Sequence, residues 1–122
     1  MLTPPADPRL VGWWSGSARP GAETGSAVLT AHTVHTGGGA FDRLADLVTG
    51  DLVRVRLTKG VVRYTVASVR TLDRDALAAA SPRLFRSDVR GRLVLITCSG
   101  WNGSYYVSNT VVIAHPLARA KS

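Results

Sequence analysis

Two stretches of alternating residues in the middle of the sequence constrain the fold most strongly. Val and Arg alternate in Leu52–Leu57, and an alternation with the same period of two fills Val61–Val69 after the short turn Thr58-Lys59-Gly60. A period of two places apolar side chains on one face of a strand and polar ones on the other, so each stretch predicts a half-buried strand. The tight turn predicts that the two strands form an antiparallel hairpin.

Apolar runs elsewhere predict three more strands, at Ala27–Thr30, Leu93–Thr97 and Asn109–Ala114. A polar loop is expected over Ser99–Ser104. Short strands connected by few helical turns are typical of a β-barrel or sandwich, so we expect a mainly β fold.

Two segments predict short helices. Apolar residues recur at helical spacing within Phe41–Val48, which indicates one or two turns. Asp73 can cap a helix over Arg74–Ala80, which the dipeptide Ser81-Pro82 is expected to end.

The length and composition limit the class of protein. A chain of 122 residues leaves room for one domain, and a hydrophobic fraction of 45% excludes wholesale disorder. No apolar stretch approaches the roughly 18 residues that a membrane span requires, and no signal peptide is visible. The single cysteine, Cys98, excludes an internal disulfide and a multi-cysteine metal site. We expect no metal and no cofactor.

The net charge of +7 indicates either an anionic neighbour or an arginine-rich composition. The basic residues are scattered, without the run of five or six that a nucleic-acid patch often shows. A basic β-barrel that binds nucleic acid is therefore kept only as an alternative, and we expect no nucleic-acid partner.

Cys98 is the first candidate for chemistry, because it follows an apolar strand and begins a glycine-containing loop. A strand end holds a side chain firmly while leaving it accessible, which suits a nucleophile, although a buried structural thiol fits the position as well. A nucleophilic cysteine needs a base or a cation nearby. Of His32, His35 and His115, the first also ends an apolar strand.

Four segments in order resemble the sortase family from about Pro8 to Pro116. They are the apolar strand ending in Ala31-His32, the Gly50-Asp51 pair before an alternating strand, the Leu95-Ile96-Thr97-Cys98 stretch, and Val11-Gly12-Trp13-Trp14 followed by Arg19-Pro20-Gly21. The third is similar to the sortase signature Leu-x-Thr-Cys. The last resembles the start of actinobacterial sortases of class E/F type, most of all class F.

The resemblance implies a cysteine transpeptidase on an eight-stranded β-barrel with one or two short helices. Such enzymes cleave a C-terminal sorting motif of the Leu-Pro-x-Thr-Gly kind. Cys98 would attack the Thr carbonyl and form a thioacyl-enzyme, while His32 would protonate the departing amine and deprotonate the incoming one. The implied partners are surface proteins with a C-terminal sorting signal and an amine acceptor of the cell wall or a pilin. The implied location is the outer side of the cell membrane.

Two features depart from the family pattern. Sortases place an arginine on the last strand opposite the cysteine, but no arginine lies between Cys98 and Arg119. Alignment on the last apolar run puts Asn109 at that place, or Val107 if the register moves by two. The family also has a membrane anchor and a first pair of strands, whereas about ten residues precede Val11. The chain is either a fragment or pairs its open sheet edge with something else, and no anchor is visible in it.

The expected organisation is an extended N-terminal arm over residues 1–10, a sortase-like catalytic domain over 11–117 and a C-terminal tail over 118–122. The resemblance suggests that Thr97, Leu84, Phe85 and Trp101 contact the substrate. Thr97 fits equally well as an ordinary strand residue, and Leu84 and Phe85 as core residues. The main alternative function is a catalytically degenerate sortase fold that binds peptides or assembles with a partner.

Overall fold

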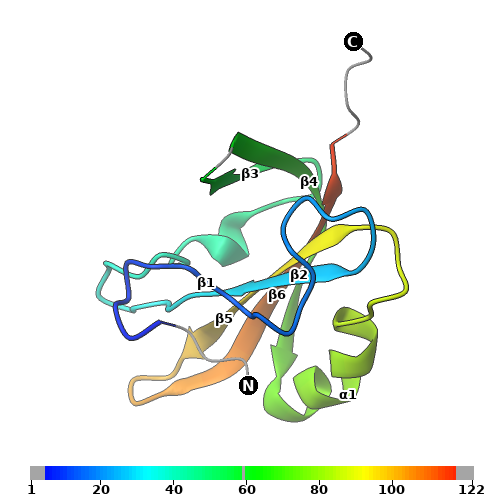
Figure 1. Ribbon diagram of the computed structural model, residues 1–122. Helices are drawn as coiled ribbons and strands as arrows, with labels where there is room; N and C mark the ends of the chain where they lie inside the picture. Colours follow the sequence, from blue (N-terminus) through cyan, green and yellow to red (C-terminus); the bar gives the residue numbers. More distant parts are fainter. Residues whose placement is uncertain (1–4, 59, 118–122) are drawn as a thin grey trace.

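A single curled sheet of six strands forms the centre of the molecule in the computed structural model, which describes residues 5–58 and 60–117 (Figure 1). The strands are β1 (Gly12–Trp13), β2 (Ser26–Thr30), β3 (Leu52–Leu57), β4 (Gly60–Asp73), β5 (Arg92–Trp101) and β6 (Tyr106–Pro116). Their order in the sheet is β1-β2-β5-β6-β4-β3. Strands β2 and β5 pair in parallel, and every other pair is antiparallel.

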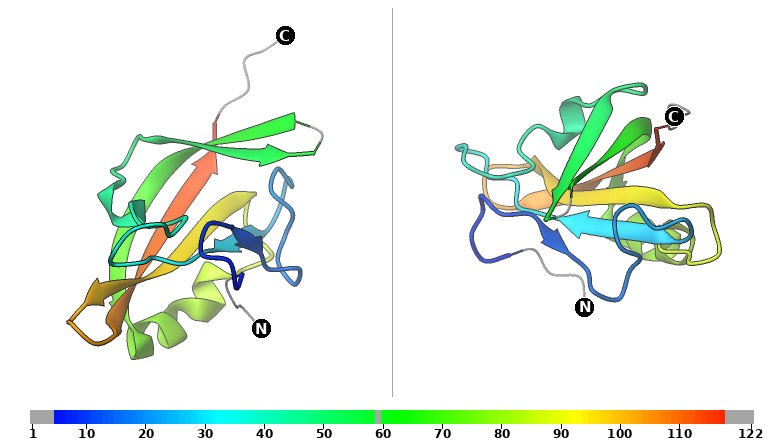
Figure 2. Two further views of the ribbon diagram at one scale, coloured as in Figure 1. Left: turned by 90° about the vertical axis from the view of Figure 1, so that its left-hand side faces the viewer. Right: turned by 45° about the horizontal axis from the view of Figure 1, so that its top comes forward.

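The sheet curls until it forms a half-barrel, because β4 is long and twists as it passes from one end of the sheet to the other (Figure 2). A register shift between Val66 and Ser68 adds to this bend. The predicted hairpin is confirmed as β3 and β4, which pair from Leu52↔Thr65 to Leu57↔Gly60. The mainly β, barrel-like fold is likewise confirmed.

Two apolar clusters cover the two faces of the sheet. We call the face inside the curl the inner face; its cluster contains Leu29, Tyr64, Val66, Leu95 and Val112. The helix α1 (Arg74–Leu84) covers the other side, which we call the outer face. The outer cluster contains Val28, Ala80, Val94, Ile96 and Val111. Residues two apart on a strand therefore share a cluster, as a period of two requires.

Helix α1 begins as predicted, since an Asp73 carboxylate oxygen accepts the backbone N–H of Ala76 at 2.7 Å. The prediction that Ser81-Pro82 ends it is wrong, because the helix continues through Pro82 to Leu84. Proline has no N–H to donate to the carbonyl four residues earlier. The Ser81 hydroxyl donates to that carbonyl, on Ala78, at 2.9 Å and replaces the lost bond.

The remaining elements differ from the expected ones mainly in length. Strand β5 continues past Cys98 to Trp101, where the expected loop should have begun, and Trp101 pairs with Tyr106 at the start of β6. The two rings meet edge to face at 5.0 Å, which favours this extension of the hairpin. The helical turns expected over 41–48 reduce to the 3-10 helix η1 (Leu44–Asp46).

Two expected segments lie largely outside the described residues. The C-terminal tail, 118–122, does so completely, and of the N-terminal arm only residues 5–10 are described. These include a turn in which the Leu10 N–H donates to the Asp7 carbonyl at 3.1 Å. Within the described ranges, no helix is long and apolar enough to cross a membrane.

The cross-strand pair Thr97 and Thr110 gives a test of the inner-face packing. The Thr97 hydroxyl donates to the Ala31 carbonyl at 2.7 Å, whereas the fully buried Thr110 hydroxyl has no hydrogen-bond partner among the described residues. We expect Thr97→Val to lower the free energy of unfolding by about 1–2 kcal/mol and Thr110→Val to raise it by about 1 kcal/mol. Urea denaturation measures both, and equal signs for the two variants would contradict the assignment.

Candidate active site

Strand register brings Cys98 and Asn109 into direct opposition on the sheet. Cys98 of β5 pairs with Asn109 of β6, which in turn pairs with Leu72 of β4. We call these three residues the Cys98 row. Because Val94 and Ile96 pack in the outer cluster, the alternation along β5 turns the Cys98 side chain to the same outer face. The position two residues away, Val107, is not the partner of Cys98.

The thiol of Cys98 is accessible. The five residues of β5 immediately before it, Leu93 to Thr97, are all buried, and Cys98 is the first exposed residue after them. The strand is therefore held firmly by its core residues up to one position before the sulfur. An exposed side chain on a rigid element is the arrangement that a nucleophile requires.

His32 is carried toward this end of β5 by the parallel pairing of β2 with β5. The last pair in the ladder is Thr30↔Ile96, and the same register carried two residues further sets His32 level with Cys98. His32 itself is half-buried, and its carbonyl accepts the Phe41 N–H at 3.1 Å. No hydrogen bond joins its imidazole to the Cys98 sulfur in the described part of the chain. The His32 imidazole and the Cys98 thiol thus lie near the same strand end without a hydrogen bond between them.

Thr97 fastens the segment that carries His32. Its hydroxyl donates to the Ala31 carbonyl and lies 2.7 Å from the Thr33 hydroxyl. Its side chain belongs to the inner face and is 3% exposed. Both neighbours of His32, Ala31 through its carbonyl and Thr33 through its hydroxyl, therefore contact the residue that immediately precedes Cys98.

The other residues singled out from the sequence lie in three different settings. Leu84 is 4% exposed and belongs to the outer cluster. This position agrees with the core role that the sequence analysis kept as an alternative. Phe85 is half-buried and meets Trp14 edge to face at 5.5 Å. Trp101 is partly exposed, and the alternation along β5 turns it to the inner face, opposite to Cys98.

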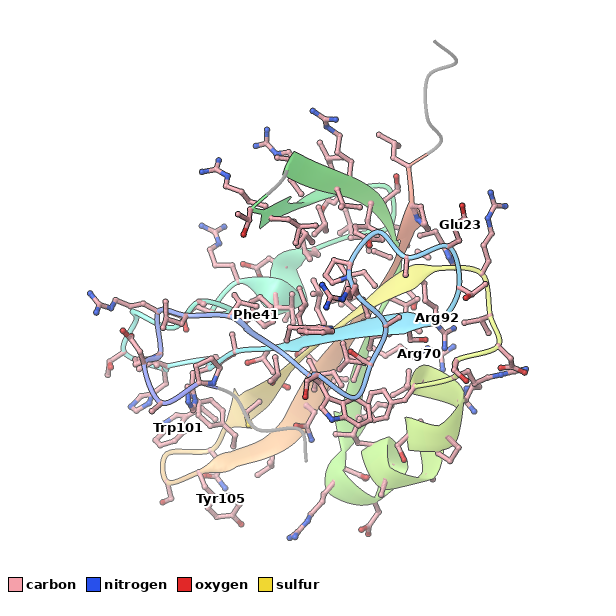
Figure 3. All side chains as sticks on the ribbon, viewed as in Figure 1. Glu23, Phe41, Arg70, Arg92, Trp101 and Tyr105 are labelled. Carbon is pink, nitrogen blue, oxygen red and sulfur yellow. The ribbon has the colours of Figure 1, made fainter. Side chains whose placement is uncertain are left out.

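The structure contains a ring stack between His35 and Trp101 that the sequence did not predict. The ring centroids are 3.8 Å apart and the planes differ by 7°. The stack joins the loop after β2 to the far end of the β5–β6 hairpin, where Figure 3 labels Trp101. No local signal in the sequence connects these two residues, because the contact depends on the parallel pairing of distant strands.

Electrostatically, the region around Cys98 contains no cluster of ligands for a metal. Across the described ranges, no group of three or more His, Cys, Asp or Glu side chains comes together. The site therefore offers a thiol, an imidazole and a neutral amide as its chemical groups, a set suited to acyl transfer through a covalent intermediate.

Comparison with known proteins identifies the family. The model of the sortase domain matches residues 3–117, and the chain belongs to this family. Similar solved structures include sortase C1 of GBS pilus island 1 (TM-score 0.72, 23% identity), sortase C-1 from Actinomyces oris (0.72, 23%) and sortase A from Corynebacterium diphtheriae (0.72, 22%). The comparison with curated proteins gives no match.

The likeness to these structures extends over most of this chain but about half of theirs. The matches cover 92%, 89% and 90% of this chain, and 53%, 59% and 49% of the three sortases in the same order. The chain thus spans about half the length of these sortases.

The His35–Trp101 stack predicts a measurable anchoring of the loop. We expect Trp101→Ala to speed hydrogen exchange of the backbone amides in 33–41 several-fold, because the stacked partner that holds His35 is removed. Mass spectrometry of peptic fragments measures the exchange. Tyr105→Ala is the matched control, because this exposed neighbouring aromatic residue takes no part in the stack. An equal effect of both variants would contradict the anchoring.

Proposed function

We propose that this protein is a sortase-type cysteine transpeptidase in which Cys98 is the nucleophile. The observation that carries the proposal is the position of the exposed thiol at the end of a buried strand, directly opposite Asn109 and beside the segment that bears His32. Membership of the sortase family supports the same assignment.

The proposed reaction consists of two acyl transfers. The Cys98 thiol gives its proton to His32 as the sulfur attacks a peptide carbonyl. The tetrahedral intermediate then collapses with release of the amine portion, to which His32 passes that proton. A second amine then attacks the thioester and loses its proton to His32, which frees the thiol. The expected donor is a C-terminal sorting motif of the Leu-Pro-x-Thr-Gly kind, cleaved after Thr.

Asn109 is proposed to stabilise the oxyanion. Its amide can donate hydrogen bonds from a position directly across from the reacting sulfur. A neutral donor gives a weaker bond than a charged one by roughly a factor of two. We therefore propose a slower enzyme than one with a guanidinium at this place.

The substrate contacts are also proposals. Phe85, half-buried on the outer face beside Trp14, is the best placed of the apolar candidates to meet the Leu and Pro of the motif. Leu84 supports it from the core, while Thr97 and Trp101 act from the inner face by holding the loop that carries His32. The Val11-Gly12-Trp13-Trp14 stretch, followed by Arg19-Pro20-Gly21, favours class F within the family. The proposed partners are surface proteins with a sorting signal and an amine acceptor outside the membrane.

A second function is favoured by one specific observation. Asn109 carries no charge at the place opposite Cys98, so the fold can serve to bind sorting peptides without cleaving them. The two functions differ in whether a thioester forms at Cys98.

Replacing the nucleophile separates these two functions. We expect Cys98→Ala to reduce cleavage of a quenched fluorescent Leu-Pro-x-Thr-Gly peptide at least 1,000-fold, because no thioester can form. Fluorescence measures cleavage, and mass spectrometry of the wild-type protein detects the acyl-enzyme. Because Cys98 is exposed, the unfolding midpoint of the Cys98→Ala variant should equal that of the wild type. Residual turnover close to that of the wild type would exclude Cys98 as the nucleophile.

The oxyanion role of Asn109 has its own test. We expect Asn109→Ala to lower kcat about 10- to 100-fold with little change in KM, because the amide acts mainly in the transition state. Val107→Ala is the matched control, since Val107 is an exposed residue of the same strand that is not opposite Cys98. If the Val107 variant loses as much activity as the Asn109 variant, the assignment of Asn109 fails.

A further inference from the structure

A cavity of about 470 Å³ lies between α1 and the strands β4 and β6, on the same outer face as Cys98. Its lining contains three arginines, Arg70, Arg83 and Arg92, together with the Ser68 hydroxyl. None of the described lining residues is acidic. Figure 3 shows Arg70 and Arg92 next to one another above α1. Three arginines therefore line this cavity, and no carboxylate is among its lining residues.

Arg92 is held in place by the protein itself. Its Nε donates to the Ser26 hydroxyl at 2.9 Å, and one terminal nitrogen donates to the carbonyls of Arg83 and Leu84. These are carbonyls at the end of α1, where a cation is favourable. Burial, and to a smaller extent the charge of Arg86, lower the pKa of Arg92. The negative charge of an anion in the cavity would act in the opposite direction and favour the charged form of Arg92.

The three arginines are not neutralised by the protein. None of them takes part in an ion pair within the described part of the chain, where the pairs involve Arg9, Arg43 and Arg86. Arg70 and Arg83 are exposed and point into an accessible space, while Arg92 supplies a fixed wall. This combination of one fixed and two exposed guanidinium groups suits a carboxylate or a phosphate.

The cavity begins at the Cys98 row. Leu72 lines it and belongs to that row, two strands away from Cys98. Two strand spacings amount to about 10 Å, and an extended peptide rises about 3.3 Å per residue. A peptide bound at Cys98 can therefore place a side chain in the cavity three or four residues from its reacting carbonyl.

We propose that this arginine cavity is a subsite for a carboxylate of the substrate. The inference deepens the proposed function: it assigns a preference for an acidic residue in the donor peptide or in the amine acceptor. Arg70 and Arg83 bind the carboxylate, and Arg92, which is bonded to the carbonyls at the end of α1, adds its charge. Arg70 and Arg83 determine specificity and take no part in the acyl transfer.

The first test does not depend on catalysis. Inorganic phosphate is expected to raise the melting temperature of the wild-type protein above that in sodium chloride of equal ionic strength, because an anion bound to the native state stabilises it. Arg70→Gln should lose most of this shift. Arg54→Gln, an exposed arginine on β3 outside the cavity, should keep it. No shift in the wild type, or an equal loss in both variants, would overturn the subsite.

The second test identifies the source of the carboxylate. In the Cys98→Ala background, fluorescence anisotropy compares Leu-Pro-Ala-Thr-Gly peptides with Glu or Gln immediately before the Leu. With Cys98 present, Gly-Gly-Glu and Gly-Gly-Gln are compared as acceptors. We expect at least a fivefold preference for Glu in one of the two arms, lost in Arg70→Gln and kept in Arg54→Gln. No preference in either arm would overturn the proposal. Phosphate binding without any peptide turnover would instead contradict the transpeptidase while leaving an anion site.

Discussion

The parallel pairing of β2 with β5 is the interaction on which the site depends. The ladder ends at Thr30 and Ile96, and beyond β2 the Thr97 hydroxyl holds the chain through the Ala31 carbonyl and the Thr33 hydroxyl. A shift of one residue in this register would turn every side chain of β2 to the opposite face and separate His32 from the Cys98 row. The buried apolar residues of both strands make such a shift costly. The core therefore sets the register that places His32 level with Cys98.

The two faces of β5 carry different kinds of residue at the same strand end. The inner face carries Thr97, which ties down the loop after β2, and Trp101, which stacks on His35 of that loop. The outer face carries Cys98, which is left open because the helix-covered cluster ends at Ile96. The alternation of the strand therefore places the anchoring residues on one face and the accessible thiol on the other.

The sequence predicted the features that depend on local pattern. The β3–β4 hairpin and the Asp73 cap follow from period and residue type within a few positions. The sequence did not predict that α1 continues through Pro82, because this continuation depends on a compensating hydrogen bond from Ser81. The pairing of Cys98 with Asn109 was one of two registers that the sequence allowed. The His35 stack and the arginine cavity required distant strands to be placed first.

The sheet connects the arginine cavity with the position opposite Cys98, where sortases carry an arginine and this chain carries Asn109. Asn109 occupies the position across from the thiol, and the next strand on the same face, β4, carries Arg70 one row further along. Arg70 is farther than Asn109 from an oxyanion at Cys98, since two strand spacings, about 10 Å, separate its strand from β5. It is close enough to hold another part of the same peptide. Binding and transition-state stabilisation, which a single arginine beside the nucleophile can combine, would then be divided between Arg70 and Asn109.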